Sequence, residues 1–250
     1  MKYKVYVVSL PERKDRRERV KNYFPPFKNI EIVDAYSPET RPRWSDRFFA
    51  NDYFPDMDRA KACFASFYNT YKRIAEGDEE WGIQVCDDTV FHPDIINILD
   101  KYNPPEDCGF IAMNNFRGRA QSIQQVINQL YTKAGDYQFY YNIKPYKEDD
   151  ETWGIIGAIH RDCAKKICKE MWNMKTFIHD EIWVDGHTVR VDWTIGLMFN
   201  WYNLMDKWNI YKTARPIAFD TGLLSEVSDS SINRYKIENG KLISLEERNL

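Results

Sequence analysis

Two adjacent carboxylates, Asp87 and Asp88, stand where a short apolar stretch ends, in the segment "IQVCDDTVFHPD". The apolar residues at 83 and 85 are typical of a buried strand, and a proline-led segment typical of a helix follows. Aspartates at such a position can close a loop by bonding to nearby backbone amides. They can also bind a metal ion or a phosphate, because open α/β sheets bind ligands beyond the carboxyl ends of their strands.

A second group of charges follows the first apolar stretch, in the turn "SLPERKDRR". Six basic residues crowd the helix expected there, namely Arg13, Lys14, Arg16, Arg17, Arg19 and Lys21. They can form a solvated helix face that pairs with Glu12, Asp15 and Glu18. Alternatively, the helix N-terminus and its guanidinium groups bind a nucleotide diphosphate. Neither GxGxxG nor GxxxxGK[ST] is present, so the sequence carries no dinucleotide fingerprint and no P-loop.

Predicted strands and helices alternate along most of the chain. Strands are expected at 3–8, 30–33, 83–85, 108–114, 152–160 and 208–219, and helices at 11–23, 59–76, 93–102, 119–134 and 161–172. Residues 189–205 pass from a strand-like to a helical pattern. Ser9 and Glu12 have the spacing of a capping box for the first helix. The alternation predicts an α/β fold with a mixed, mostly parallel sheet flanked by helices. Asn239-Gly240 suggests a small C-terminal β-hairpin.

The overall composition favours one soluble domain. The chain has 250 residues, 35 basic and 38 acidic, a balance unlike that of proteins that coat nucleic acid. No apolar run approaches the roughly 20 residues that span a bilayer, and the N-terminus does not resemble a signal peptide. The five cysteines include no CxxC pair, which argues against a zinc cage and favours a reducing, cytoplasmic location. The four scattered histidines are expected to be caps, loop residues or surface residues.

Six stretches in the same order make the chain similar to glycosyltransferase family 25, the lipopolysaccharide-type galactosyltransferases that share a domain type with collagen galactosyltransferases. "VVSLPERKDRRERV" resembles the family's "N-L-x-R-x-x-D-R-R" turn, "ACFASF" its "G-C-x-x-S-H" helix start, and "VCDDTV" its "E-D-D-V" strand end. "WGIIGAIHRDCAKKI", "RVDW" and "RPIAFDTGLLSEVSDS" are similar to its later segments. The resemblance covers about residues 3–230.

The sequence departs from the family pattern at four of these positions. Cys86 stands where the family has an acidic residue, Phe67 where it has a histidine, Ala158 where it has a tyrosine, and Asp220 where it has a glutamine. The resemblance keeps Asp88 in the direct metal position, with Asp87 beside it. Asp220 is a candidate replacement for the missing ligand.

The resemblance implies a GT-A fold with a nucleotide-binding half at about 1–115, an acceptor half at about 116–230, and a hairpin and tail at 231–250. It implies a sugar-nucleotide donor such as a UDP-sugar, a glycan or glycoconjugate acceptor, inversion at the anomeric carbon, and Mn²⁺ or Mg²⁺ bound by Asp88. The nucleotide would be bound by Ser9, Leu10, Arg13, Arg16, Ser66 and Asp87.

Asp192, in "RVDW", is the expected catalytic base, because an inverting transferase needs a carboxylate on the acceptor side. Asp192 can equally be a helix N-cap, and Asp180 and Glu181 are then the alternatives. Trp153, Trp183 and Trp193 are either core residues or platforms for sugar rings. Two other functions stay open: a metal-dependent phosphoryl or nucleotidyl transferase, and a degenerate domain that only binds nucleotide or glycan.

Overall fold

The computed structural model describes residues 1–48, 57–92, 94–113, 139–143, 156–172, 183–184, 187–188, 208–213, 217–220, 235–238 and 241–244. Within these residues the main sheet has seven strands in the order β2-β1-β3-β7-β5-β10-β6. Their bounds are β1 Tyr3–Ser9, β2 Ile30–Asp34, β3 Trp81–Cys86, β5 Cys108–Ala112, β6 Phe139–Ile143, β7 Gly157–His160 and β10 Asn209–Thr213.

Five of these seven strands run in the same direction. β1 is parallel to β2 and to β3, and β10 is parallel to β5. β7 lies antiparallel between β3 and β5, and β6 is antiparallel to β10. The predicted mixed, mostly parallel α/β sheet is therefore confirmed for the described residues.

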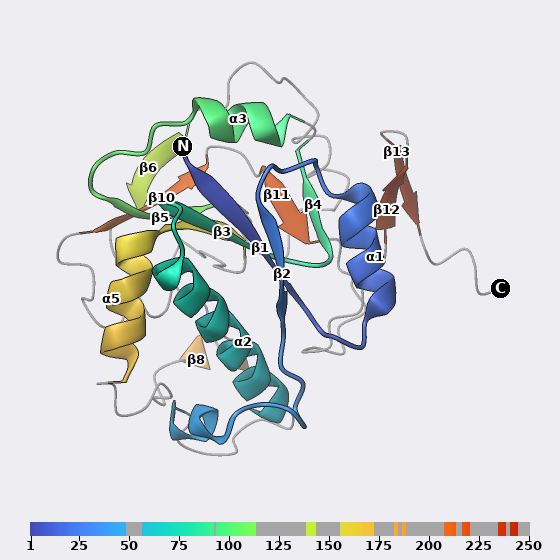
Figure 1. Cartoon of the computed structure of the whole chain (residues 1–250), viewed down its shortest axis with the longest axis vertical. Helices are drawn as coiled ribbons and strands as arrows, with labels where there is room; N and C mark the ends of the chain where they lie inside the picture. Colours follow the sequence, from blue (N-terminus) through green and yellow to red (C-terminus); the bar gives the residue numbers. More distant parts are fainter. Residues whose placement is uncertain are drawn as a thin grey trace.

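Helices cover both faces of this sheet (Figure 1). α2 (Met57–Glu76) and α5 (Arg161–Met171) pack against each other on one face. α1 (Lys14–Tyr23) and α3 (Ile95–Lys101) contribute to the core on the other face, and a short 3₁₀ helix, η1 (Arg43–Phe48), precedes α2. Each of the predicted helices that falls within described residues is present, with ends shifted by a few residues.

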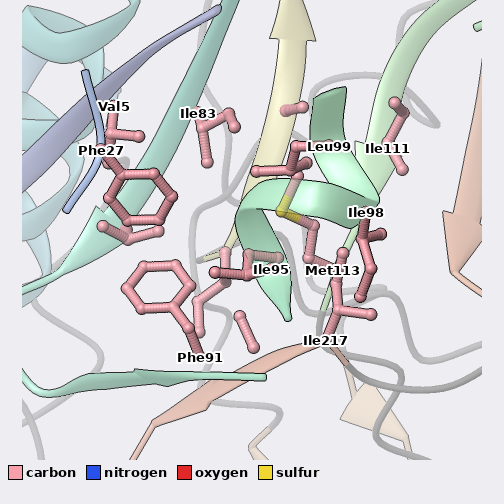
Figure 2. Close-up of a cluster of buried hydrophobic side chains, with 14 of the residues drawn as sticks. Val5, Phe27, Ile83, Phe91, Ile95, Ile98, Leu99, Ile111, Met113 and Ile217 are labelled. Carbon is pink, nitrogen blue, oxygen red and sulfur yellow. The ribbon is translucent and has the colours of Figure 1, made fainter. Parts of the chain in front are cut away.

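The core on the α3 side is built from alternate strand residues. Val5, Ile83 and Ile111 each point to this face, and Ile95 and Leu99 of α3 belong to the same buried cluster (Figure 2). Successive side chains of a strand point to opposite faces, so the same strands supply the second core under α2 and α5. This two-sided burial explains the nearly continuous apolar runs of β1 and β3.

Gly82 of β3 allows α2 to approach the sheet closely. A Cβ atom at this position would lie 2.3 Å from Cγ1 of Ile74, which is closer than side-chain atoms can approach. The contact fixes the height of α2 over the strand that leads into Asp87 and Asp88. As predicted, α2 ends immediately before Gly77.

Gln84 is a polar side chain inside this second layer. It is 2% exposed, and neither atom of its amide finds a hydrogen-bond partner among the described residues. An unsatisfied buried polar group costs about 1–3 kcal/mol. We therefore expect Gln84→Met, which keeps the length and removes the polar atoms, to raise the free energy of unfolding by about 1 kcal/mol in urea denaturation. Gln84→Glu is the opposing control and should lower it. A clear loss of stability in Gln84→Met would contradict this account of the amide.

Three small antiparallel ladders lie outside the main sheet. They are β4 (Thr89–Phe91) with β11 (Ala218–Asp220), β8 (Trp183–Val184) with β9 (His187–Thr188), and β12 (Tyr235–Glu238) with β13 (Lys241–Ser244). The predicted turn at 239–240 and the predicted helix at 119–134 lie outside the described residues, as do residues 189–205. The β4–β11 ladder lies near α1 in Figure 1 and matters for the site.

Two of the histidines are caps, as expected. Nδ1 of His92 accepts a hydrogen bond from the Asp94 amide just before α3. Nδ1 of His160 accepts one from the Asp162 amide at the start of α5. All five cysteines are free thiols.

Candidate functional site

The carboxyl ends of β1, β2 and β3 emerge at one edge of the sheet. Ser9, the last residue of β1, pairs with Asp34, the last residue of β2. Val8 pairs with Cys86 at the end of β3, and the Asp87 amide donates to the Val8 carbonyl oxygen at 3.2 Å. The Asp87–Asp88 turn therefore continues directly from the parallel sheet, at the edge where such sheets bind ligands.

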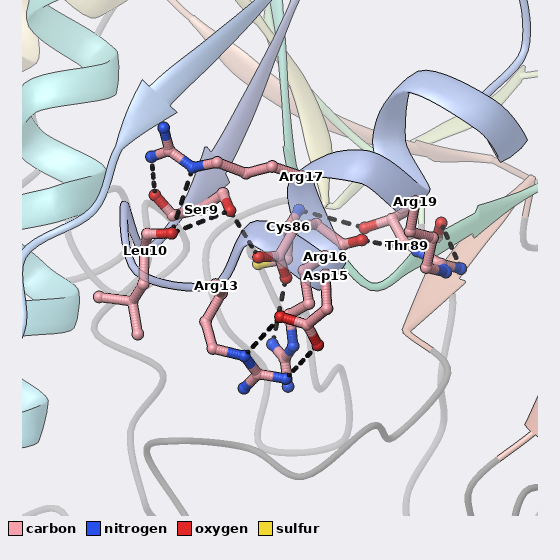
Figure 3. A network of polar contacts seen from close by, with 10 residues as sticks. Ser9, Leu10, Arg13, Asp15, Arg16, Arg17, Arg19, Cys86 and Thr89 are labelled. Carbon is pink, nitrogen blue, oxygen red and sulfur yellow. Dashed lines mark hydrogen bonds and ion pairs between the residues drawn. The ribbon is translucent and has the colours of Figure 1, made fainter.

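Figure 3 shows a network of polar contacts among residues of β1, β3 and α1. The buried Asp87 carboxylate takes part in this network. Its residue is 4% exposed. The Ser9 hydroxyl donates to its Oδ2 at 2.7 Å, and Nη1 of Arg16 donates to its Oδ1 at 3.1 Å. Arg16 is itself 9% exposed, so the two opposite charges are buried together. Both oxygens of the Asp87 carboxylate thus have protein partners.

Arg19 holds the backbone of the same turn. Its Nη1 donates to the Asp87 carbonyl oxygen at 2.6 Å, and its Nη2 donates toward the Thr89 carbonyl oxygen at 3.4 Å. The guanidinium also lies 5.9 Å from the ring centroid of Phe24, at the end of α1. Arg16 and Arg19 are three residues apart on α1, a spacing that places both on one helix face.

Thr89 closes the turn from the other side. Its Oγ1 accepts a hydrogen bond from the Cys86 amide at 3.1 Å, and the residue is 1% exposed. The turn between β3 and β4 therefore carries hydrogen bonds at residues 86, 87 and 89.

Asp88 differs from its neighbour. It is half-buried, and no side chain of the described residues forms a hydrogen bond or an ion pair with its carboxylate. Burial and the nearby Asp87 carboxylate raise the pKa of Asp88 to about 6, against the opposing effect of the Arg16 and Arg19 guanidiniums. Asp88 is therefore the carboxylate of this turn that is left for a ligand.

The predicted capping box at Ser9 and Glu12 is wrong. Ser9 belongs to β1, and its hydroxyl bonds to Asp87, whereas α1 begins at Lys14 with Arg13 as a cap residue that forms no side-chain cap bond. The Ser9 hydroxyl donates to the buried Asp87 carboxylate instead of bonding to an amide of the first helical turn. Arg17 instead fastens the turn, because it donates to the carbonyl oxygens of Ser9 at 2.9 Å and Leu10 at 3.2 Å.

Arg13 lies at the solvent side of the same turn. It forms a two-bond pair with exposed Asp15, at 3.1 Å from Nε to Oδ1 and 3.0 Å from Nη2 to Oδ2. The Arg13 guanidinium lowers the pKa of Asp15 to about 2. Arg13 is thus near the strand ends, but the structure gives it a local partner.

Ser66 occupies the buried face of α2. Its hydroxyl donates to the Ala62 carbonyl oxygen at 2.7 Å and accepts from the Tyr36 amide at 2.8 Å. These bonds fasten α2 to the segment that follows β2. Phe67 and Ala158, two of the departures from the family pattern, are core residues at 3% and 0% exposure.

Asp220 is brought to the turn by the β4–β11 ladder. In this ladder Asp220 is the register partner of Thr89, the residue next to Asp88. The ladder is anchored by two backbone bonds of Ile217, to Met113 at 3.0 Å and to His92 at 2.8 Å. Residue 220 is therefore near residue 88 in space although it is remote in sequence.

The acceptor-side predictions lie largely outside the described residues. This applies to Asp192, to its alternatives Asp180 and Glu181, and to Trp153 and Trp193. Trp183 is the first residue of β8.

Of the site residues expected from the sequence, six lie together around two neighbouring turns: Ser9, Leu10, Arg13, Arg16, Asp87 and Asp88.

Sequence reasoning missed two residues of this network, Arg19 and Thr89. Arg19 is one of the six basic residues of the first predicted helix, and its spacing of three from Arg16 indicates that both lie on the same helix face. Thr89 follows Cys86 by three residues, a spacing at which threonine often bonds to the backbone of a turn.

The oxygen donors of this turn fit a small divalent cation. Carboxylate oxygen is the ligand that Mg²⁺ and Mn²⁺ prefer, whereas the Cys86 sulfur is a soft ligand. No group of three or more His, Cys, Asp or Glu able to hold a metal occurs among the described residues. Mg²⁺ is commonly bound by one or two carboxylates together with substrate phosphates. Asp88 therefore fits an ion that is shared with a diphosphate.

Comparison with known families agrees with the geometry. The model of glycosyltransferase family 25 (LPS biosynthesis protein) matches residues 2–182, a span that includes β1, α1 and the Asp87–Asp88 turn. The chain therefore belongs to glycosyltransferase family 25, which implies glycosyltransferase activity. No curated protein matches the sequence.

None of the helices in the described residues has the length and apolar character that crossing a membrane requires.

Proposed function

We propose that the protein transfers a sugar from a nucleotide-sugar donor, specifically a UDP-sugar, to a glycan acceptor. The observation that carries this proposal is the Asp88 carboxylate, which stands at the carboxyl end of β3 without a side-chain partner among the described residues. In this proposal the chain has a GT-A organisation, with residues 1–115 binding the nucleotide and residues 116–230 the acceptor.

The nucleotide would lie against the β1–α1 turn. Arg17 holds this turn through the Ser9 and Leu10 carbonyl oxygens, so the backbone there is fixed before a ligand arrives. Arg13 is the guanidinium suited to reach a phosphate, because its ion pair with Asp15 is exposed to solvent and such pairs are weak. Arg16 is buried against Asp87 and contributes to the turn.

Asp88 would hold Mn²⁺ or Mg²⁺ against the donor diphosphate. When bound, such an ion supplies positive charge that stabilises the departing nucleoside diphosphate. Asp220 would provide a second carboxylate from β11. It would replace the acidic residue that the family has at the position of Cys86. The register of Asp220 opposite Thr89 supports this assignment.

Inversion would require a carboxylate that accepts the proton of the acceptor hydroxyl on the side of the sugar away from the diphosphate. We propose Asp192 for this base, with Asp180 and Glu181 as alternatives. Asp192→Asn keeps the ability to cap a helix and removes the base. It should therefore lose sugar transfer while its melting temperature and UDP affinity stay near those of the wild type. Normal transfer by this variant would leave Asp192 as a cap.

Incubation with a panel of UDP-sugars, in Mn²⁺ and separately in EDTA, tests the function as a whole. A transferase releases free UDP, slowly with water and faster when a glycan acceptor is present. A phosphoryl or nucleotidyl transferase releases other products from the nucleotide. A domain that has lost catalysis shows thermal stabilisation by UDP without release.

A further inference from the structure

Arg19 forms hydrogen bonds to the backbone on both sides of Asp88. The carbonyl group of Asp87 immediately precedes Asp88, and the carbonyl group of Thr89 belongs to the residue that follows it. Arg19 donates to both oxygens, at 2.6 and 3.4 Å. One planar guanidinium, with donors in a fixed fork, thus sets the position of the chain on either side of Asp88.

The remaining contacts of the turn act in the same direction. The Asp87 amide is fixed to the Val8 carbonyl, and the Cys86 amide is fixed to the Thr89 hydroxyl. The Asp87 side chain is held by Arg16 and Ser9. The backbone around Asp88 is therefore fastened at several points, while the Asp88 carboxylate itself has no side-chain partner in the described structure.

Charge divides the two aspartates in the same way. The Arg16 guanidinium and the Asp87 carboxylate form a buried pair, which leaves Asp88 to meet a cation. The Arg19 guanidinium lies over the ring of Phe24. This ring packs edge-to-face on Phe91 of the core, with centroids 5.1 Å apart. The arginines of this helix face therefore point into the protein's own turn.

We propose that Arg16 and Arg19 are positioning residues that aim Asp88 at the metal–diphosphate, and that Asp87 is an anchor for the turn and not a metal ligand. This inference rests on the proposed function, since it concerns how that site is held in place. It changes the roles expected from the sequence, where Arg16 and Asp87 were candidate nucleotide-binding residues. Fixing a ligand before it binds lowers the ordering cost of binding and raises affinity.

UDP affinity measured by calorimetry, once in EDTA and once in saturating Mn²⁺, distinguishes an arginine that positions Asp88 from one that contacts the nucleotide. We expect Arg19→Gln to bind UDP in EDTA as the wild type does, because Arg19 does not contact the nucleotide. The gain in affinity that Mn²⁺ brings should fall about tenfold, which corresponds to about 1.4 kcal/mol. Arg19→Lys should behave similarly, because an ammonium group cannot reproduce the two-pronged contact.

Lys21→Gln, at an exposed position of the same helix, is the matched control for the loss of one positive charge and should leave both affinities unchanged. Arg13→Gln provides the contrast: as a proposed nucleotide contact, it should weaken UDP binding in EDTA as well. Circular dichroism and the melting temperature show that each variant is folded. Should Arg19→Gln not fold, Arg19→Lys makes the same comparison.

An equal loss of UDP affinity in EDTA and in Mn²⁺ would show that Arg19 contacts the nucleotide, and would overturn the inference. An unchanged Mn²⁺ gain would also overturn it, even with a lowered melting temperature, because a purely structural arginine behaves in that way. The metal part of the proposed function fails separately, if wild type and Asp88→Asn both show no gain in UDP affinity with Mn²⁺.

Discussion

Asp88→Asn should lower sugar transfer by about a thousandfold and leave the protein folded. The substitution keeps the shape of the side chain and removes the charge that holds the cation. Loss of metal stabilisation of a leaving diphosphate removes several kcal/mol of transition-state stabilisation, and each 1.36 kcal/mol is a tenfold change in rate. We therefore expect transfer to fall by about a thousandfold, measured as product formed from the preferred UDP-sugar in Mn²⁺.

The stability of this variant should not fall. Asp88 has no side-chain partner in the described structure, and burial together with the nearby Asp87 carboxylate raises its pKa to about 6, so its negative charge lowers the stability of the fold in a way that a neutral Asn does not. Asp220→Asn should show a smaller loss of transfer, as expected for a second ligand. Asp162→Asn, which removes an exposed carboxylate at the start of α5, is the control and should transfer normally. Substantial transfer by Asp88→Asn in Mn²⁺ would remove Asp88 from the site.

Arg16→Met should produce the largest loss of stability. It leaves the Asp87 carboxylate buried without its cation, and breaking a buried ion pair on one side typically costs about 3–5 kcal/mol. Urea denaturation followed by circular dichroism measures the change in free energy of unfolding. The exposed ion pair between Lys72 and Glu76 is the control. Lys72→Met breaks this pair and should change the free energy of unfolding by less than about 1 kcal/mol.

The double variant Arg16→Met, Asp87→Asn separates the cost of the orphaned charge from the loss of packing. When both charges are absent, the remaining Asn can still accept the Ser9 hydrogen bond, so most of the lost stability should return. Additive losses in the double variant would mean that Arg16 acts mainly through packing of its long side chain.

The strand and helix pattern could be predicted from the sequence because it depends on local periodicity. The apolar runs of β1 and β3 and the amphipathic spacing of α2 fix these elements without reference to the rest of the chain. Strand direction cannot be obtained in the same way. β7 lies antiparallel between two strands that run the opposite way, and no feature of its short apolar sequence distinguishes it from a parallel neighbour.

The two turns of the site show the same division. The sequence placed Asp87, Asp88 and the arginines of α1 at strand ends, and the structure brings them together. Their partners were less predictable, because they are set by tertiary contacts. Ser9 bonds to a carboxylate 78 residues away instead of capping its own helix, and Arg16 reaches a partner 71 residues away. A capping motif read from local spacing therefore does not predict the hydrogen bond of a side chain that is also near a buried charge, because leaving that charge without a hydrogen bond costs more free energy.

The β4–β11 ladder has a consequence for the order in which the protein can assemble. The turn that carries Asp88 is made early in the chain, but β11 reaches it only from residues 218–220. β10, whose Thr213 bonds to a carbonyl 101 residues back, must likewise insert beside β5. Contacts of such long sequence separation form slowly, since a large loop has to close first. During synthesis on the ribosome, β4 and one edge of β5 therefore wait with unpaired backbone groups until the C-terminal third of the chain emerges.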